Sequence, residues 1–334
     1  MQQVNERPAP QPFALGRWLR RFGTLLGFLG VVAFFWWQKP TTFMTISNWL
    51  NITQQVSILG VVAFMMTIVM VMGDFDLSVG TMASLAGIVA ALLFQREFPL
   101  WQAVLVALLV GMAGGLLNGL LVSFVGISPF VATLGMLTVF GGVALSISSG
   151  KTIFGRAIPE AVGGFAQGGL SLSGIGLPAV SIPNLTLLAL GVLVVVWLLL
   201  EQTVFGRRLY AIGGNREAAR LAGVRVRILR LIAFMCTGLG AAIAGLMLVS
   251  RLSSANPTQG DGLMLNAIAA VFLGMTMSEE GEPHVLGTLV GVLILGVLNN
   301  GLTQMRIDSY IQQILTGGII ILAVTLSSLS RRSS

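Results

Sequence analysis

The chain has 334 residues, of which 55% are hydrophobic and 9% charged, and its formal net charge is +7. Soluble domains carry about 25% charged residues, so this composition excludes an ordinary soluble globular protein. Long apolar runs between short polar breaks predict an all-α polytopic membrane protein, because the runs are too uniformly apolar for alternating barrel strands.

The beginning and end of the chain are polar and basic. Segment 1–22 precedes the first apolar run, and no small-residue cleavage site follows that run. This pattern predicts a cytoplasmic N-terminal segment rather than a signal peptide. A single transmembrane domain is expected over 23–328, followed by a cytoplasmic tail at 329–334.

Apolar runs of about 20 residues predict about ten transmembrane helices. They lie near 23–38, 56–73, 78–95, 101–124, 128–148, 183–201, 229–250, 263–278, 284–303 and 308–328. In the segment 41–55, Phe43, Ile46 and Trp49 recur at helical spacing, which predicts an interfacial helix.

Lysine and arginine positions predict the orientation. With the N-terminus in the cytoplasm, most basic residues fall on the inside, so the positive-inside rule predicts that both termini are cytoplasmic. This bias explains the pI near 11.0 without nucleic acid as a partner. It leaves an exterior loop at 149–182, rich in Gly, Pro and Ser, and a basic cytoplasmic segment at 202–228. The single cysteine, Cys236, lies in an apolar run and predicts neither a disulfide nor a metal site.

A weak internal repeat is visible between two spans. LLNGLLVSFVGISPFV (116–131) resembles VLNNGLTQMRIDSYI (297–311), and the predicted topology orients the two copies oppositely across the membrane. Inverted repeats of this kind are common in transport proteins. The sequence therefore suggests a transporter with pseudo-symmetric halves.

The stretch GDFDLSVG (73–80) places Asp74 and Asp76 between two apolar runs. A carboxylate in hydrocarbon costs about 3 kcal/mol on insertion scales. The predicted topology puts the stretch at the inner end of spans two and three, where the aspartates are expected to reach water or polar backbone. Two interpretations stay open: Asp76 or Ser78 caps the following helix, or Asp74 or Asp76 fixes a gate on a transport pathway.

The cytoplasmic stretch FGRRLYAIGGNREAARLAGVRVR (205–227) predicts a short helix. Gly213 and Gly214 are expected to break the preceding structure, after which Asn215 is a good N-cap. Gly223 suits a left-handed C-cap, and the result is a helix of about two turns.

Charge and side-chain size on this helix favour a docking role. Glu217 in the first turn and Arg220 near the last both complement the helix dipole. Ala218, Ala219 and Ala222 give it small faces that fit a groove. An isolated helix this short is marginal in water, so we expect it to dock on another protein. The alternative is a basic loop held by anionic lipid headgroups.

The same stretch, GGNREAARLAGV, closely resembles the coupling-helix segment of permease subunits in bacterial ABC importers for ribose, arabinose, xylose and similar sugars. GDFDLSVG (73–80), RLSSANPTQGDGLMLNAIAAVFLG (251–274) and GTLVGVLILGVLNNGL (287–302) match the same family. The resemblance therefore covers nearly the whole chain, in order.

This resemblance implies one half of a homodimeric pore in the bacterial inner membrane, with the ten-span fold first associated with the cobalamin importer. Cytoplasmic ATP-binding subunits would hold ATP and magnesium, a periplasmic sugar-binding protein would dock on the outer loops, and this chain would bind no cofactor. The residues implied in ATPase coupling are Gly214, Asn215, Glu217, Ala218, Ala219, Arg220, Leu221 and Gly223.

Because sugars are neutral, the pathway is expected to offer hydrogen-bonding groups rather than charge. The pathway or helix-junction candidates are Asp74, Asp76, Ser78, Asn118, Asn299 and Asn300, and Ser84, Thr133 and Thr138 are further polar candidates. Two glycine pairs, Gly114 with Gly115 and Gly141 with Gly142, are expected to allow close helix packing.

Two local patterns resemble other sites. SSGKT (148–152) ends like a phosphate-binding loop, but Leu145 stands where that loop requires glycine, so this chain is not expected to hydrolyse ATP. TMSEEGEPHV (276–285) departs from the family's glycine-rich turn. Its acidic residues, Glu279, Glu280 and Glu282, beside His284 predict a solvated turn, or an electrostatic contact with the ATPase, rather than a metal site.

Two other function classes compete with the importer. An ion-coupled secondary transporter of a small polar solute is expected to carry intramembrane acids or histidines, whereas these spans are nearly free of charge apart from Asp74 and Asp76. A membrane-embedded transferase requires a nucleophile, base or metal cluster, and none is recognisable in the sequence.

Overall fold

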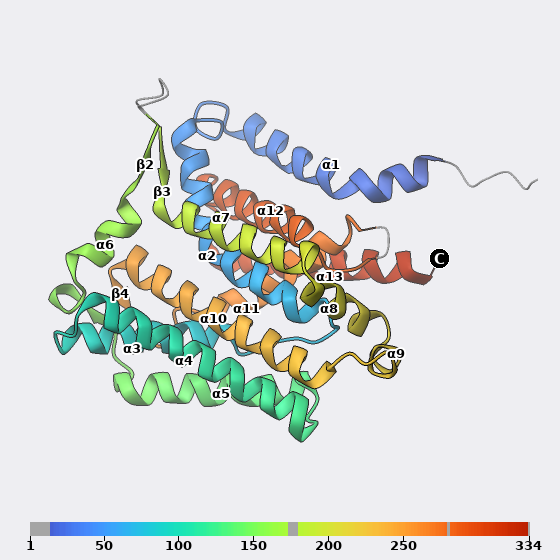
Figure 1. Cartoon of the computed structure of the whole chain (residues 1–334). Helices are drawn as coiled ribbons and strands as arrows, with labels where there is room; N and C mark the ends of the chain where they lie inside the picture. The colour runs from blue at the N-terminus through green and yellow to red at the C-terminus, as the bar shows by residue number, and fades with distance from the viewer. Residues whose placement is uncertain (1–13, 173–179, 279–280, 333–334) are drawn as a thin grey trace, which may run out of the picture.

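The computed structural model describes residues 14–172, 180–278 and 281–332, and Figure 1 shows them as a bundle of helices. The helices are α1 (Ala14–Gln38), α2 (Ile46–Met70), α3 (Val79–Gln95), α4 (Leu100–Leu120), α5 (Pro129–Ser148), α6 (Glu160–Gln167), α7 (Asn184–Trp197), α8 (Val204–Gly214), α9 (Arg216–Leu221), α10 (Val226–Leu252), α11 (Asp261–Met275), α12 (Val285–Gln304) and α13 (Ser309–Arg332). Short π-helical turns extend α4 to Val125 and α7 to Gln202.

Two small antiparallel sheets join the loops at one end of the bundle. Strand β1 (Ile153–Phe154) pairs with β4 (Ser254–Ala255), and β2 (Gly169–Ser171) pairs with β3 (Ser181–Pro183). The predicted exterior loop 149–182 therefore contains β1, α6, β2 and the start of β3, while its residues 173–179 lie outside the described part.

Six helices are long and apolar enough to cross a membrane: α2, α4 with its π-helical turn, α5, α7 with its π-helical turn, α10 and α12. The predicted spans 23–38, 78–95 and 263–278 correspond to shorter apolar helices, Gly23–Gln38 in α1, Val79–Gln95 in α3 and Asp261–Met275 in α11. The tenth predicted run lies in α13. The prediction of an all-α polytopic membrane protein is confirmed.

The chain ends differ slightly from the expectation. Residues 1–13 of the predicted N-terminal segment lie outside the described part, but helix α1 already begins at Ala14. At the other end, α13 continues to Arg332, through most of the predicted tail.

The predicted interfacial helix at 41–55 is wrong. Helix α2 begins at Ile46 and continues without a break to Met70, and no proline interrupts it. Thr45 caps its first turn by accepting a hydrogen bond from the Asn48 backbone. Phe43 is fully buried and packs against Phe35 rather than lying at a lipid surface.

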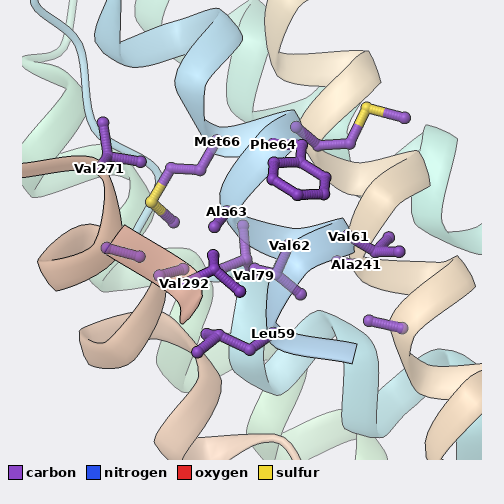
Figure 2. Close-up of a cluster of buried hydrophobic side chains, with 14 of the residues drawn as sticks. Leu59, Val61, Val62, Ala63, Phe64, Met66, Val79, Ala241, Val271 and Val292 are labelled. Atoms are coloured by element: carbon purple, nitrogen blue, oxygen red, sulfur yellow. The ribbon is translucent and has the colours of Figure 1, made fainter. Parts of the chain in front are cut away.

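The core forms around α2 and α10. Helix α2 packs against α7, α10, α11 and α12, and α10 packs against α3 and α4 as well. Figure 2 shows buried apolar side chains from α2, α3, α10, α11 and α12 meeting in one cluster, among them Val61, Val62, Val79, Ala241, Val271 and Val292. Both central helices are therefore largely surrounded by protein.

Glycines set the distance between α4 and α10. A Cβ atom on Gly115 would lie 2.2 Å from the Phe234 carbonyl oxygen, and one on Gly238 would lie 2.2 Å from the Gly111 carbonyl oxygen. Small residues at such contacts let two membrane helices approach closely. A Cβ on Gly114 would lie 2.0 Å from Met82, so the structure also gives that predicted glycine pair its packing role.

The same expectation is wrong for Gly141 and Gly142 on α5. A Cβ atom on Gly142 would meet nothing within 4 Å, and one on Gly141 would only touch Thr81 at an ordinary 3.5 Å. These two glycines line a cavity instead.

Helices α3 and α11 are short and begin side by side inside the bundle. A Cβ on Gly80, in the first turn of α3, would lie 2.5 Å from the carbonyl oxygen of Gly260, the residue before α11. The Ser84 hydroxyl accepts a hydrogen bond from the Gly260 backbone at 2.9 Å. The first turn of α3 is therefore in direct contact with the residue that precedes α11.

The two helices then run toward opposite ends of the bundle. Along α3, Gly87 approaches Val249 near the end of α10. Along α11, Gly274 approaches Gly287, whose neighbour Thr288 bonds to Thr67 near the end of α2. With 17 and 15 residues against 27 in α10, neither helix runs the length of the bundle, and each is separated from the helix before it by a break in the helical backbone.

Candidate functional site

The structure contains the predicted short helix, α9, and its caps are those expected from the sequence. The Asn215 side chain accepts a hydrogen bond from the Ala218 backbone at 2.9 Å. At the other end Gly223 has a φ of +82°, and the backbone N–H groups of Gly223 and Val224 donate back to Arg220 and Ala219. This pairing is the Schellman motif, which explains why the helix stops after six residues.

The predicted break at Gly213 and Gly214 is wrong. Helix α8 continues through both glycines, and the chain turns only at Asn215, whose backbone is extended. A Cβ on Gly213 would lie 2.0 Å from the Val71 carbonyl oxygen. Glycine at this position therefore lets α8 approach the end of α2, because no side chain stands between the two backbones.

One face of α9 points away from the protein. Ala219 packs inward, whereas Ala218, Ala222 and Gly223 are exposed. Leu221 is 77% exposed and lies beside the exposed Ala222. Figure 1 shows α9 at the opposite end of the bundle from β2 and β3. The exposed face therefore offers an apolar contact to a partner.

Glu217 and Arg220 form an ion pair across one turn of α9. The hydrogen bond from Arg220 lowers the pKa of the Glu217 carboxyl, which keeps it ionised at neutral pH. Both side chains are largely exposed, so the pair adds little to stability.

Asp74 connects α9 to the core. Its carboxylate accepts two hydrogen bonds from the Arg230 guanidinium, at 2.6 and 3.0 Å, and a third from Arg216 Nη2 at 3.0 Å. Asp74 and Arg230 are buried, whereas Arg216, the first residue of α9, is about half exposed. Asp74 is therefore shared between a fixed partner on α10 and an accessible partner on α9.

Asp76 is satisfied entirely by neutral donors. Its carboxylate accepts hydrogen bonds from the backbone and hydroxyl of Ser78 at 3.0 and 2.7 Å, and from the Thr237 hydroxyl at 2.7 Å. The Asn118 side chain donates to Asp76 at 3.3 Å and to the Ser78 hydroxyl at 2.8 Å. These contacts hold the start of α3 against α4 and α10.

The aspartates were expected to reach water or polar backbone, and the structure shows burial for both and a backbone contact for Asp76, from the Ser78 N–H. Asp74 is 2% exposed and Asp76 is 1% exposed. Thr237, the partner of Asp76, lies about 16 Å along α10 from its first residue, at 1.5 Å per residue. The junction of residues 71–78 thus folds back into the bundle, where Arg216 and Arg230 pair with Asp74 and neutral donors surround Asp76.

The capping interpretation is confirmed only in part. Ser78 precedes α3 but makes no side-chain hydrogen bond to its first turn. Asp76 accepts the Ser78 backbone N–H, so it fixes the chain one residue before the helix.

The chain is similar to known proteins over most of its length. Residues 48–324 match the family model described as the permease component of the branched-chain amino acid transport system. The chain belongs to this permease family. It is 37% identical over 312 residues to the ribose import permease protein of Escherichia coli (strain K12), which covers 93% of this chain and 94% of the relative.

Two further relatives carry other sugar names. The D-allose transport system permease protein of Escherichia coli (strain K12) is 32% identical over 326 residues, or 97% of both chains. The xylose transport system permease protein of the same organism is 32% identical, covering 95% of this chain and 93% of the relative. No solved structure matches the chain. The family predicted from the four motifs is thus confirmed, and the protein is the permease component of an ABC transporter, in which separate ATPase subunits hydrolyse ATP.

Sequence reasoning missed one charged residue of the permease junction. Arg230 falls inside the predicted seventh span, 229–250, yet its charge counts toward the cytoplasmic side in the topology prediction, and the structure buries it. Arg230 is thus the one exception, among the described residues, to the expectation that the spans are nearly free of buried charge apart from Asp74 and Asp76. The sequence did contain a signal for this pair, because an arginine inside an apolar run usually has a buried acidic partner, and Asp74 and Asp76 had no assigned partner.

Other predicted pathway residues of the permease lie apart from this network. Asn299 and Asn300 are half-buried on α12, and Asn300 accepts a hydrogen bond from Gln304. Thr133 is buried and bonds to the Pro129 carbonyl in its own helix. Ser84 holds Gly260, and only Thr138 lines a cavity.

The two remaining patterns have ordinary local structures. After α5 ends at Ser148, the chain of SSGKT turns through Ser149 and Gly150 and enters β1, so no helix follows as a phosphate-binding loop requires. His284 precedes α12, as expected. Glu279 and Glu280 lie outside the described residues.

Proposed function

We propose that this permease forms the translocation pathway of an ATP-driven importer for a monosaccharide or related polyol, and that α9 couples it to the ATPase. The names of its relatives, which import or transport ribose, D-allose and xylose, support a pentose or hexose as cargo. The main support for the coupling role is the ion pair between Arg216 on α9 and the buried Asp74.

The proposed mechanism follows from that contact. ATP binding and dimerisation of the ATPase subunits move α9 through its exposed face, around Leu221. Arg216 is the first residue of α9, so a movement of α9 changes the length and direction of its hydrogen bond to Asp74. Asp74 is fixed to Arg230 on α10, and Asp76, two residues on, holds α3 and α4. A displacement at the cytoplasmic end is thereby passed to the broken helix α3.

The proposed architecture is the ten-span fold of the cobalamin importer, with pseudo-symmetric halves. Supporting it, α3 follows α2, and α11 follows α10, through connections that fold back into the bundle and meet at Gly80 and Gly260. The two broken helices then run in opposite directions, as inverted repeats require. The proposed domain is 23–328, with cytoplasmic termini and coupling segment 202–228.

The proposed complex contains a second copy of the chain, cytoplasmic ATP-binding subunits and a periplasmic sugar-binding protein. Helix α5 is only 22% buried in the single chain, which leaves an apolar face for the second copy or for lipid. The exterior loop 149–182, which contributes strands to two small sheets, is the proposed contact for the binding protein. ATP and magnesium would be held by the ATPase.

Reconstitution tests this function against the secondary transporter. The permease, its ATPase and its binding protein are placed in proteoliposomes, and uptake of labelled ribose, allose and xylose is measured with and without ATP. We expect ATP-dependent uptake of at least one sugar. Uptake by the permease alone, driven by a proton gradient, would instead establish ion-coupled transport.

A further inference from the structure

A cavity of about 480 Å³ lies where α3, α5 and α11 meet. It is lined by the first turn of α3, including Thr81, by Thr138 and Gly142 on α5, and by Thr258 and Asp261 at the start of α11. Small-molecule sites typically have volumes of about 300–1,000 Å³ and a mostly apolar wall with a few polar groups. The volume and the mixture of wall residues are therefore those of a site for one small molecule.

The two helix breaks create this cavity. Because α3 and α11 begin side by side at Gly80 and Gly260, their first turns face the same space instead of continuing through it. The wall opposite them is the glycine face of α5, where Gly142 has no atom within 4 Å of its missing side chain. No close helix contact requires glycine at this position.

The polar groups of the cavity mostly accept hydrogen bonds. The Thr81 hydroxyl donates its hydrogen to the Ser78 carbonyl, and the Thr258 hydroxyl donates to the Asn256 side chain. A hydroxyl has a single hydrogen, so both oxygens have only lone pairs left for a ligand. An ionised Asp261 can also only accept, and it forms no ion pair with any residue that the structure describes.

This wall distinguishes between ligand classes. A molecule with many hydroxyl groups supplies the donors that the wall lacks. An anion would be repelled by the unpaired Asp261. A bare metal ion prefers six or more oxygen ligands of which several are carboxylates, whereas this cavity has one carboxylate and is much wider than an ion.

A second cavity of about 360 Å³ lies further along the same two helices. It is lined by Gln95 at the end of α3, by Ser148 at the end of α5, and by Lys151 and Thr152 in the segment that follows. Along α3, Gln95 lies about 21 Å beyond Thr81, at 1.5 Å per residue. The seam between α3 and α5 therefore carries two successive cavities, the outer one near the sheet of β1 and β4.

We propose that the inner cavity is the solute-binding site of the permease, and that it takes one neutral polyhydroxylated molecule whose hydroxyl groups donate to Thr81, Thr258 and Asp261. The outer cavity is its entrance from the exterior loop. This inference rests on the proposed function, because it places the sugar of the importer at a defined point of the chain.

Filling the cavity tests the site. Gly142→Leu adds four side-chain carbons to the wall, and the control Val194→Phe adds four carbons to α7 at a position that is exposed but does not line the cavity. Each variant is purified with its ATPase and binding protein and assayed in proteoliposomes. We expect Gly142→Leu to lower uptake of labelled ribose, allose or xylose by about tenfold or more, while Val194→Phe transports like the wild type.

The outcomes separate this inference from the proposed function. If the wild-type complex transports none of the three sugars, the proposed function fails. If it transports a sugar and Gly142→Leu transports it equally well, the cavity is not the solute site and only this inference is overturned.

A second pair of variants decides the matter if Gly142→Leu does not assemble. Asp261→Asn keeps the size of the side chain but halves its acceptor oxygens, whereas Asp261→Glu keeps the carboxylate. We expect Asp261→Asn to lower uptake about tenfold, as for a lost hydrogen bond to a charged group, and Asp261→Glu to retain more of it. Wild-type uptake by Asp261→Asn would contradict the proposal.

Discussion

Arg230 and Asp74 are 156 positions apart in the chain and form a buried, two-point ion pair, with Nε 2.6 Å from Oδ2 and Nη2 3.0 Å from Oδ1. Such paired contacts fix orientation as well as distance. They lock the connection after α2 onto the first turns of α10. Since Arg216 bonds to the same carboxylate, the pair is also the point at which α9 acts on the core.

We predict that Asp74→Asn destabilises the permease by about 3–5 kcal/mol, because it leaves Arg230 buried without its negative partner. The measurement is thermal unfolding of the detergent-purified complex. The double variant Asp74→Leu with Arg230→Met should lose less stability than the sum of the losses measured for Asp74→Leu alone and Arg230→Met alone. The double variant leaves neither member of the pair buried as an unpaired charge. Additive losses would show that the two residues do not interact.

Arg216→Gln should instead affect transport with little effect on stability. Arg216 is about half exposed, and ion pairs with an exposed partner contribute about 0–1 kcal/mol. We expect a clear drop in ATP-dependent uptake, with ATPase subunits still bound and the unfolding temperature nearly unchanged. The control is Arg208→Gln, which removes an exposed arginine from α8. Equal uptake by both variants would argue against transmission through Arg216.

The outer face of α9 gives a prediction on assembly. Leu221 is 77% exposed, and the buried core of a protein contact is more apolar than the rest of the surface. We expect Leu221→Asp to abolish co-purification of the ATPase and all ATP-dependent uptake, while membrane insertion continues. Co-purification at the wild-type level would show that the ATPase does not bind through Leu221 of α9.

The sequence predicts those parts of the site that are shaped by interactions between residues close together in the chain. The shape of α9 was predictable because its determinants, Asn215 and Gly223, lie within nine positions and act on their own backbone. Family and fold class were predictable because motifs and apolar runs are also local. The depth of the junction at residues 71–78 was not, since it depends on contacts with Arg230 and Thr237 far along the chain.

The glycines show the same limit. A sequence indicates that glycine is present but not what surrounds it. Gly114 and Gly142 were expected to have one role, yet the first is pressed against Met82 and the second borders a cavity. The difference arises from neighbouring helices whose faces become known only when they are packed.

The left-handed turn at the end of α9 predicts a difference between two glycines. A Cβ atom added to either Gly214 or Gly223 would meet nothing within 4 Å, but only Gly223 has a positive φ. We therefore expect Gly223→Ala to cost about 1–2 kcal/mol of local stability and to lower uptake. Gly214→Ala should be nearly neutral. Hydrogen exchange of the α9 amides measures the local effect, and equal protection in both variants would contradict it.

The packing of α4 against α10 leads to a last contrast. A Cβ atom on Gly115 would stand 2.2 Å from the Phe234 carbonyl oxygen, and backbone atoms cannot move aside as a flexible side chain does. Gly115→Ala should therefore push the two helices apart, at a cost of about 1–3 kcal/mol or more. Gly135→Ala on α5 meets nothing within 4 Å and serves as the control.

Moving α4 should also disturb the junction, because Asn118, one turn beyond Gly115, donates to Asp76 and Ser78. We expect Gly115→Ala to lower both the unfolding temperature and sugar uptake, whereas Gly135→Ala preserves the unfolding temperature. A Gly115→Ala permease with unchanged stability would mean that α4 and α10 are not in this close contact. If uptake is unchanged although stability is lowered, the position of α4 does not affect transport through the junction of residues 71–78.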